Sequence, residues 1–393
     1  MRASVTLPGS KSLSNRALII RYLSGPFNIA NLSLSTDTSV LHTVLNHAGR
    51  EADIGDAGTA FRFLTAAFAV TDGERLITGT DRMKERPIRE LVDALRSLGA
   101  DITYAGKNGF APLLVRGKNL PGGVIDIDAS VSSQFISALL MVAPMLHDGL
   151  SINLLGTIAS SPYISMTLGL MKHFGVDAVW KEDSIHVPCQ DYKPADYSVE
   201  ADWSAAAPWF EMAALGNETD IKLKGLSNDS LQGDKALAEK MVLLGVSAEE
   251  KNGGITLIKK ENPSPGKLQF DCLATPDLAP ALAVTAAAQG KHVILTGLRS
   301  LNTKESRRLD VLVTNLERAG INITGDSDSL RIEGGSIAPG SAFETHNDHR
   351  MVMCFAPLAL KVPVMLDDGS SVKKSYPRFL DELAAAGFEI TSS

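Results

Sequence analysis

Ten residues near the N-terminus, Leu7–Arg16 (LPGSKSLSNR), combine several groups that bind anions. Pro8-Gly9 predicts a turn, and the apolar run that begins at Ala17 predicts a helix directly behind it. The first backbone N–H groups of a helix have no partner within the helix and carry partial positive charge. Serine hydroxyls, Lys11 and Arg16 add donors and charge at the same place. The stretch therefore predicts an anion site at a helix N-terminus.

Two other interpretations of this stretch compete with an anion site. The first is a solvated helix cap with incidental charges, and the stretch alone leaves it open. The second is a nucleotide-binding P-loop, whose pattern requires a glycine directly before the lysine. Ser10 occupies that position here, so the P-loop is disfavoured.

Four further cationic stretches lie just before or at the start of predicted helices. They are Arg82–Pro87 (RMKERP), Thr303–Arg308 (TKESRR), His346–Met351 (HNDHRM) and Ser371–Pro377 (SVKKSYP). Cations at a helix N-terminus oppose the helix dipole, so they need a local reason such as a bound anion. Each stretch alone is also compatible with a solvated helix start. The histidine pair would suit a metal, but no third ligand set is evident, and contact of Arg350 with a phosphate or carboxylate is favoured.

The elements that position these residues form a weak sixfold repeat. Each unit has a helix rich in small and apolar residues, a short β-like run, and then an amphipathic helix that ends near a glycine before another strand. Helices of the first kind begin near Ser12, Gly58, Ser132, Asp202, Pro276 and Asp348. The matching order of the two helix types argues against mere α/β alternation. Six units suggest two domains of three units each.

The repeat also predicts where a ligand binds. If the three first-kind helices of a domain run roughly parallel, their positive ends converge on one face. Two such domains facing each other would form a cleft for a multiply anionic ligand. Asp196–Asp202 is the candidate hinge between the third and fourth units, and Asn262–Gly266 (NPSPG) is predicted to be a loop.

Composition narrows the class of protein. The chain has 393 residues, 44% of them hydrophobic and 21% charged, as in an ordinary globular protein of two or three domains. The net charge of −7 gives no general attraction to nucleic acid or to an anionic membrane. No apolar run reaches the length of a membrane span, and the N-terminal segment lacks a secretory h-region. Cys189, Cys272 and Cys354 are far apart, so we expect reduced thiols, a cytoplasmic location, and neither a disulfide framework nor a zinc site.

The motifs together resemble the EPSP synthases (3-phosphoshikimate 1-carboxyvinyltransferases) of the enolpyruvyltransferase family. The matching stretches, in the family order, are GSKSLSNRAL, DAGTAFRFL, RMKERPIRELVDALRSLGA, SSQFISALLM, SSPYISMTLGLMKHFGV, PDLAPALAVTAA, TKESRRLD, NDHRMVMCF and KKSYPRFLDEL. They cover nearly the whole chain. The sister enzyme, which uses UDP-N-acetylglucosamine, typically carries a reactive cysteine in the loop that corresponds to Arg82–Arg86, and this chain has none there.

The resemblance implies an α/β fold, a two-domain inverse α/β barrel with each domain built from three βαβαββ repeats. The implied domains are residues 10–200 on the shikimate 3-phosphate side and residues 1–9 plus 201–393, with the active site in the interdomain cleft. The implied reaction transfers the enolpyruvyl group of phosphoenolpyruvate to the 5-hydroxyl of shikimate 3-phosphate and releases phosphate. A monomer that needs no metal or organic cofactor is implied, as is inhibition by glyphosate in competition with phosphoenolpyruvate.

The same resemblance implies roles for particular residues. Shikimate 3-phosphate would be held by Lys11, Ser12, Arg16, Ser132, Ser133, Gln134, Ser160, Tyr163, Asp277 and Lys304. Phosphoenolpyruvate would be held by Lys11, Gly58, Arg86, Gln134, Arg308, Arg350 and Lys374. Asp277 would be the base for the 5-hydroxyl, and Lys11, Lys304 and Glu305 would share the proton transfers at the enolpyruvyl methylene. Which of these three performs each step is left open.

Two features depart from the family pattern. Asp56 stands where the family commonly has Asn before Ala-Gly-Thr. The first unit lacks about twenty residues between its second helix and that motif, which we interpret as the loss of a peripheral strand.

Overall fold

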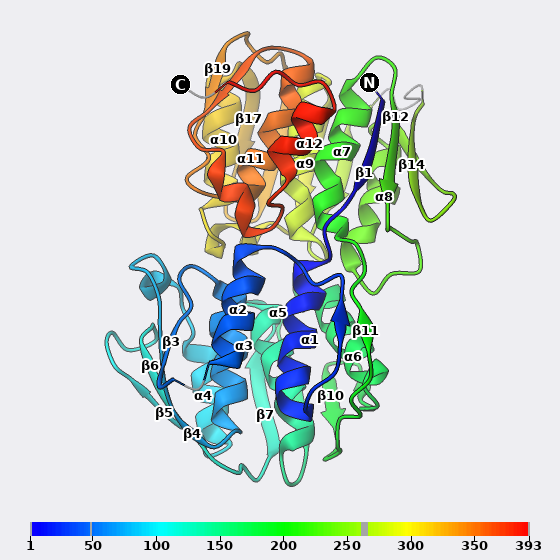
Figure 1. Ribbon diagram of the computed structural model, residues 1–393. Coiled ribbons are helices and arrows are strands. Elements are labelled where there is room, and N and C mark those ends of the chain that lie inside the picture. The colour runs from blue at the N-terminus through cyan, green and yellow to red at the C-terminus, as the bar shows by residue number, and fades with distance from the viewer. Residues whose placement is uncertain (1, 48, 261–265, 392–393) are drawn as a thin grey trace. The chain divides into compact units, whose positions relative to one another are not determined.

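The computed structural model describes residues 2–47, 49–260 and 266–391. The chain forms two compact units, residues 11–199 and residues 1–10 together with 200–393 (Figure 1). Asn262–Pro265 of the predicted loop lie outside the described residues.

The helices alternate along the chain between the two predicted kinds. Those of the first kind are α1 (Lys11–Ser24), α3 (Gly58–Ala69), α5 (Ser133–Val142), α7 (Trp203–Leu215), α9 (Ala279–Ala288) and α11 (His349–Phe355). Those of the second kind are α2 (Thr36–Asn46), α4 (Arg89–Ser97), α6 (Ser161–His173), α8 (Ala236–Val242), α10 (Arg308–Arg318) and α12 (Phe379–Ala385). Each first-kind helix begins within three residues of its predicted start.

Four sheets share one topology. In each, the first two strands are parallel and the remaining two form an antiparallel hairpin against the second. In residues 11–199 the sheets are β3 (Glu51–Asp53), β4 (Gly73–Thr78), β6 (Leu113–Gly117) and β5 (Asp101–Tyr104), and β7 (Gly123–Asp128), β8 (Leu150–Leu155), β10 (Ser184–Val187) and β9 (Val179–Lys181). In the other unit they are β1 (Arg2–Thr6), β12 (Asp220–Lys224), β14 (Gly254–Lys259) and β13 (Val246–Glu250), and β15 (Leu268–Asp271), β16 (His292–Thr296), β18 (Ser329–Gly335) and β17 (Ile321–Gly325). With the intervening helices, each sheet makes one βαβαββ repeat.

Two repeats keep only the parallel pair of strands. These pairs are β2 (Ile29–Ala30) with β11 (Tyr197–Ser198), and β19 (Ser341–Phe343) with β20 (Val364–Leu366). The first repeat therefore keeps both helices, and its described residues between α2 and β3 form no hairpin. The missing residues correspond to a peripheral hairpin, which is one strand more than the sequence predicted.

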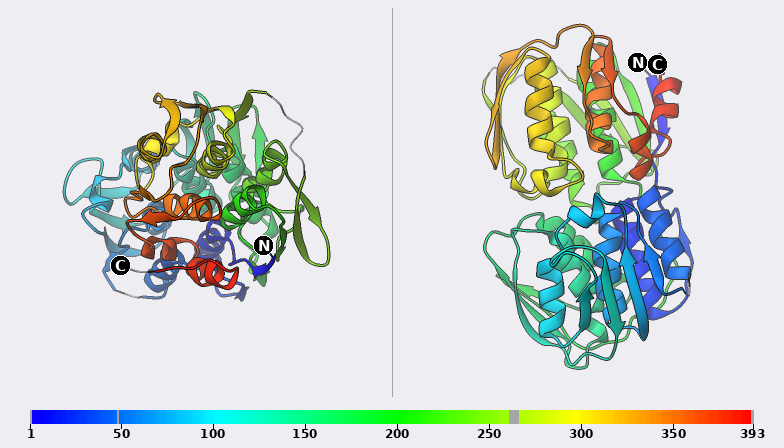
Figure 2. Two further views of the ribbon diagram at one scale, coloured as in Figure 1. Left: turned by 90° about the horizontal axis from the view of Figure 1, so that it is seen from above. Right: turned by 90° about the vertical axis from the view of Figure 1, so that its left-hand side faces the viewer.

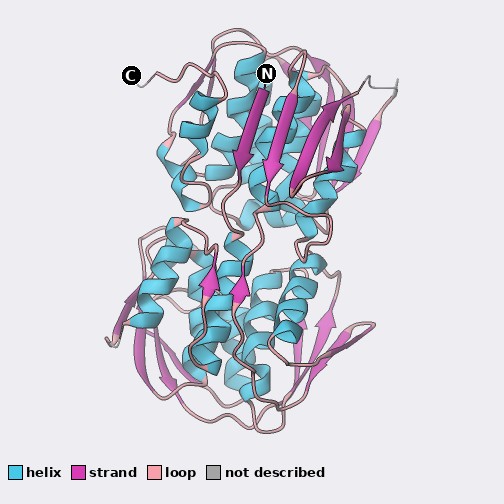
Figure 3. Ribbon diagram, turned by 45° about the vertical axis from the view of Figure 1, so that its right-hand side comes forward, coloured by secondary structure: helices cyan, strands magenta, loops and turns pink. Residues whose placement is uncertain are grey.

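The helices form the interior of each unit. In α3, α5, α7 and α9 nearly every side chain is buried, as expected for helices that are apolar all round. The strands alternate instead between buried and more exposed residues, so each sheet covers the helices with one face and meets water with the other. Figures 2 and 3 show this for each unit, with helices side by side and strands at the periphery. The prediction of a two-domain α/β fold is confirmed.

Among the described residues, the structure contains no helix with the length and apolarity that a membrane crossing requires.

Candidate active site

The predicted anion site of residues 11–199 begins with Lys11, the first residue of α1. Its Nζ lies 3.3 Å from Oδ2 of Asp37 in the first turn of α2, and both side chains are largely buried. This ion pair holds the ammonium group of Lys11 at a helix N-terminus. A lysine in this position suits the binding of an anionic ligand.

Arg16 connects three helices from within the core. Its Nε donates to the Thr167 hydroxyl at 2.7 Å, Nη2 donates to the Ser137 hydroxyl at 2.9 Å, and Nη1 donates to the carbonyl of Ser12 at 2.9 Å. Burial lowers the pKa of Arg16 to about 10, and the nearby Tyr163 opposes that shift. Arg16 thus anchors α1 to α5 and α6. Its contact with a substrate stays a prediction.

The predicted hydroxyl and amide groups lie at the starts of two neighbouring helices. Ser132 caps α5 by accepting from the backbone N–H of Gln134 at 3.3 Å. The Gln134 amide donates in turn to the hydroxyl of Thr59 in α3 at 3.2 Å. Ser160 precedes α6 with φ of 56°, in the left-handed region, and its hydroxyl makes no cap bond. Such backbone strain, about 1–3 kcal/mol, is typical of ligand-binding positions.

Two arginines converge at the start of α3. Arg62 donates through Nη1 to the carbonyl of Gly58 at 2.7 Å, and its Nε has no hydrogen-bond partner among the described residues. A side chain on Gly58 would collide with the guanidinium group of Arg86 and would lie 2.8 Å from Nη1 of Arg62. Burial lowers the pKa of Arg62 well below its usual value, the charge of Arg86 lowers it further, and Glu90 partly offsets both. This concentration of positive charge fits an anion that approaches the Gly58 backbone.

Arg62 was missing from the predicted site, although the sequence carries a signal for it. It is a lone cation in an otherwise apolar helix, and its side chain is buried. A buried charge requires a partner or a ligand. A buried cation in an apolar helix therefore marks Arg62 as a candidate site residue.

The other cations of Arg82–Pro87 form surface ion pairs. Arg82 pairs with Glu85 at 2.8 Å, and Lys84 pairs with Asp81 at 3.0 Å. Of the three cations in that stretch, Arg86 is the one whose guanidinium lies against Gly58.

Asp56 is also tied to this loop. Its Oδ1 accepts a hydrogen bond from the Thr80 hydroxyl, just before the turn Met83–Glu85. Asp56 thus makes a hydrogen bond that joins the loop to the start of α3.

The second group of predicted residues lies in the other unit, around Asp277. This residue sits in the short turn before α9. Its Oδ1 lies 3.0 Å from Nη1 of Arg308 and 3.3 Å from Nζ of Lys304, and its Oδ2 lies 3.2 Å from Nη2 of Arg350. Burial alone would raise the pKa of Asp277, but Arg350, Lys304 and Arg308 outweigh it and hold the pKa well below its usual range. The structure thus brings together four residues from three separate stretches of the sequence.

Asp348 orients Arg308 from the opposite side. Its carboxylate accepts from Nε of Arg308 at 2.8 Å and from Nη2 at 3.1 Å, a bidentate pair inside the protein. It also accepts from the Ser306 hydroxyl at 2.9 Å and caps α11 through the backbone N–H of Arg350. The sequence predicts Asp348 as a helix start, where an aspartate is a typical cap, but assigns it no role in the site.

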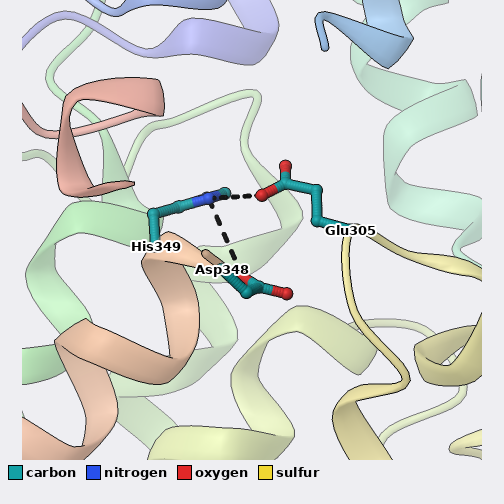
Figure 4. Close-up of side chains that lie close together, drawn as sticks. All are labelled: Glu305, Asp348 and His349. Carbon is teal, nitrogen blue, oxygen red and sulfur yellow. Dashed lines mark hydrogen bonds and ion pairs between the residues drawn. The ribbon is translucent and has the colours of Figure 1, made fainter. Parts of the chain in front are cut away.

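Glu305 and His349 form a pair beside this network (Figure 4). Oε2 of Glu305 lies 2.9 Å from Nδ1 of His349, which is almost fully buried. These two residues and Asp348 are close enough to hold a cation. Asp348, however, is already committed to Arg308, so a metal would have to displace a guanidinium. The geometry favours a hydrogen-bonded acid–base pair over a metal site.

Lys374 lies at the end of the turn Ser370–Lys374 and donates to the carbonyl of Asn347 at 3.2 Å. Asn347 and His346 both have left-handed backbone conformations, with φ of 56° and 54°. This strained turn leads directly into α11, which carries Arg350. By contrast, Arg307 pairs with Asp310 on the surface.

The chain is similar to known proteins over nearly its full length. The profile of the family "EPSP synthase (3-phosphoshikimate 1-carboxyvinyltransferase)" matches residues 42–383. The chain is 44% identical to a 3-phosphoshikimate 1-carboxyvinyltransferase of Bacteroides fragilis, over 99% of this chain and 96% of the relative. It is 34% identical to the enzyme of that name from Haemophilus influenzae, over 97% and 96%.

Solved structures share the fold. EPSP synthase from Acinetobacter baumannii superposes with a TM-score of 0.80 at 22% identity, over 98% of this chain and 96% of that one. The enolpyruvyl transferase NikO from Streptomyces tendae gives 0.76 at 16% identity, over 100% and 96%. The family profile and the near full-length identity to curated relatives show that the chain belongs to the EPSP synthase family.

Proposed function

We propose that this chain transfers the enolpyruvyl group of phosphoenolpyruvate to the 5-hydroxyl of shikimate 3-phosphate, giving 5-enolpyruvylshikimate 3-phosphate and phosphate. The observation that carries the proposal is the Asp277 cluster. The Asp277 carboxylate faces Lys304, Arg308 and Arg350, Asp348 also pairs with Arg308, and the Glu305–His349 pair lies beside Lys304 and Arg350 in the sequence. Three cations that meet two carboxylates suit multiply anionic substrates. Membership of the EPSP synthase family supports the same reaction.

We assign the substrates to groups of both units. The phosphate and carboxylate of phosphoenolpyruvate bind Arg308, Arg350 and Lys374 and the groups at the start of α3, Gly58 and Arg86. Shikimate 3-phosphate binds the donors at the starts of α1, α5 and α6. These are Lys11, Ser12, Arg16, Ser132, Ser133, Gln134, Ser160 and Tyr163. The support is their chemistry, since hydroxyls and an amide suit a polyol ring and guanidinium groups suit dianions.

Asp277 accepts the proton of the 5-hydroxyl as its oxygen attacks C2 of phosphoenolpyruvate. In the free protein it is a weak base, because three cations hold its pKa well below the usual range against the opposing effect of burial. A bound dianion would neutralise part of that charge and raise the basicity of Asp277. Substrate binding would therefore prepare the base for its task.

The methylene carbon of phosphoenolpyruvate must gain a proton before or during this attack. We propose that Glu305, oriented by His349, donates that proton, with Lys11 or Lys304 as the alternatives. Addition gives a tetrahedral intermediate that carries a methyl group. Elimination then breaks the C–O bond to phosphate and returns one methyl proton to a base. Cations around the leaving phosphate stabilise its developing charge.

Two other functions compete with this one. A transferase with another acceptor, such as UDP-N-acetylglucosamine, would share the fold. An inactive relative would bind the anions without turnover, although Asp277 and Glu305 are both present in this chain.

The test is phosphate release from phosphoenolpyruvate by the purified chain, with and without shikimate 3-phosphate. We expect release only with both substrates. Release with UDP-N-acetylglucosamine alone as acceptor would indicate the sister activity. Binding of both ligands without release would indicate an inactive relative.

We further propose a cytoplasmic monomer. The thiols of Cys189, Cys272 and Cys354 are free, which suits a reducing compartment. Sedimentation of the purified chain at several concentrations tests the oligomeric state.

Gly58→Ala tests the anion site at the start of α3. The new methyl group would overlap the Arg86 guanidinium and approach Arg62, so Arg86 must shift. We expect the KM for phosphoenolpyruvate to rise about tenfold, as for the loss of one charge-assisted hydrogen bond. Glyphosate, as a proposed competitor of phosphoenolpyruvate, should also inhibit less. If steady-state kinetics gave a wild-type KM for phosphoenolpyruvate and wild-type inhibition by glyphosate, the assignment would be contradicted.

Lys304→Arg tests whether the lysine must carry its charge. Burial lowers the pKa of Lys304, the neighbouring Asp277 raises it, and the net shift is downward. We therefore expect kcat/KM of the wild type to fall on the alkaline side at a pH below the ordinary lysine pKa of about 10.4. Arginine stays protonated there, so the variant should lose this alkaline limb, whatever its absolute rate. If the variant showed the same alkaline decrease in kcat/KM as the wild type, a group other than Lys304 would cause that decrease.

A further inference from the structure

A small cavity lies beside the Asp277 cluster, between α7, α9 and α11. Its volume is about 10 Å³, and residues of all three helices line it. Asp277 and Arg350 form part of its wall, and Glu211, Ser204 and Cys354 form another part. This volume is at the lower limit of what holds a single water molecule.

Glu211 is the unexplained residue of this wall. It is the only acidic residue of α7, and its side chain is completely buried. Neither of its carboxyl oxygens has a hydrogen bond of good geometry among the described residues, and the nearby Thr285 hydroxyl donates to the carbonyl of Ala281 at 2.7 Å. Burial raises the pKa of Glu211 well above its usual value, and Thr285 offsets only part of that shift. Burial thus favours the neutral form of this carboxyl group, which carries a proton to donate.

A second polar group at the cavity follows from Pro208. Proline has no N–H, so Pro208 cannot donate the helical hydrogen bond to the carbonyl of Ser204, one turn earlier in α7. Both residues line the cavity. The Ser204 hydroxyl is engaged elsewhere, with Asp234. The wall therefore offers a donor from Glu211 and an acceptor from the Ser204 backbone.

We propose that Glu211 is a positioning residue that holds one water molecule in this cavity against Asp277 and Arg350. The Glu211 hydroxyl donates to the water oxygen. The water donates to the Ser204 carbonyl and to the Asp277 carboxylate, and Arg350 supplies the remaining donor. Four partners of this kind satisfy a buried water.

The water gives the buried carboxyl group of Glu211 a hydrogen-bond partner. An apolar side chain of similar size would be neutral or stabilising there, because a buried carboxyl without a partner is unfavourable. With the water present, the Glu211 hydroxyl donates its hydrogen bond, and the water holds the guanidinium of Arg350 in position from inside the protein. The effect on the reaction rests on the proposed function, in which Arg350 binds phosphoenolpyruvate.

The test compares Glu211→Leu and Glu211→Met with Glu211→Gln. Leucine and methionine fill similar space without hydrogen bonds, whereas glutamine keeps a neutral donor and acceptor. We expect both apolar variants to melt at or above the wild-type temperature but to raise the KM for phosphoenolpyruvate about tenfold, with a smaller change in kcat. Glutamine should restore the KM to within about twofold of the wild type. An unchanged KM in the apolar variants, or an equal defect in the glutamine variant, would overturn the proposal.

Infrared difference spectra of the wild type against Glu211→Gln provide a readout that needs no activity. We expect a carbonyl band of a protonated carboxylic acid that the variant lacks, and its absence would overturn the proposal. A wild-type chain that releases no phosphate would instead refute the proposed function. The infrared band and a crystallographic water in the cavity would still decide whether Glu211 holds a water molecule.

Discussion

Asp277→Asn is expected to lower kcat by about 10²- to 10⁴-fold, the range usual for loss of a general base. The amide cannot accept the proton of the 5-hydroxyl. It does retain the shape of the carboxylate, and its one carbonyl oxygen can still accept hydrogen bonds from Lys304 and Arg308 when its NH2 group replaces the oxygen that faces Arg350. Because the variant removes the negative charge that these three cations share, we expect phosphoenolpyruvate to bind as tightly as in the wild type or more tightly.

Steady-state kinetics and calorimetric titration with phosphoenolpyruvate separate these two effects. Asp310→Asn is a suitable control, since Asp310 pairs with Arg307 on the surface and has no assigned role. Full turnover by Asp277→Asn would remove Asp277 from the role of base. Loss of phosphoenolpyruvate binding would show that its main task is to hold the three cations in place.

The sequence predicts the helix starts of the repeat because each start combines local signals. A polar residue, a run of small apolar residues and a following β-like segment recur six times, and all six predicted first-kind helices are present. The missing hairpin of the first repeat was harder to predict. The sequence shows only that residues are absent, and the loss of one strand differs from the loss of a hairpin only in the number of those residues.

The cationic stretches were predicted less well, for a reason that the sequence itself contains. Arg82 and Arg307 each have an acidic residue three positions further along, and both pairs form on the surface. Arg86 and Arg308 have no acidic residue three positions further along, and both turn inward. An acidic residue at that position therefore distinguishes Arg82 and Arg307 from Arg86 and Arg308.

Contacts between repeats could not be predicted from the sequence. Asp348 meets Arg308 across 40 positions of the chain, and Glu211 meets its cavity only because α7, α9 and α11 pack together. No local periodicity encodes such contacts. A lone charge in an apolar helix, as at Arg62 and Glu211, is the one sequence signal that marks these positions in advance.

Arg308→Met is expected to destabilise the protein by about 3–5 kcal/mol, as when one partner of a buried ion pair is removed. Asp348 is fully buried, and Arg308 binds both of its oxygens. Arg307→Met is the matched control, because the neighbouring arginine is exposed and its surface pair should contribute at most about 1 kcal/mol. Urea unfolding of both variants measures the difference.

The pH dependence of that destabilisation identifies its cause. Burial alone would raise the pKa of Asp348, and Arg308 outweighs it to give a net lowering, while Glu305 acts in the opposite direction. A carboxylate with a lowered folded pKa stabilises the native state above the unfolded value of about 3.9, and this stability is lost as the pH falls. Without Arg308 the pKa of Asp348 should rise, so the variant keeps more of its stability in acid. The difference in the free energy of unfolding between the variant and the wild type should therefore narrow from pH 7 towards pH 4.

Adding Asp348→Asn to Arg308→Met should recover part of the lost stability at pH 7, because the unpaired buried charge of Asp348 is removed. A gap that is constant with pH, and a double variant no more stable than the single one, would mean that Arg308 stabilises the fold by packing and not by its charge.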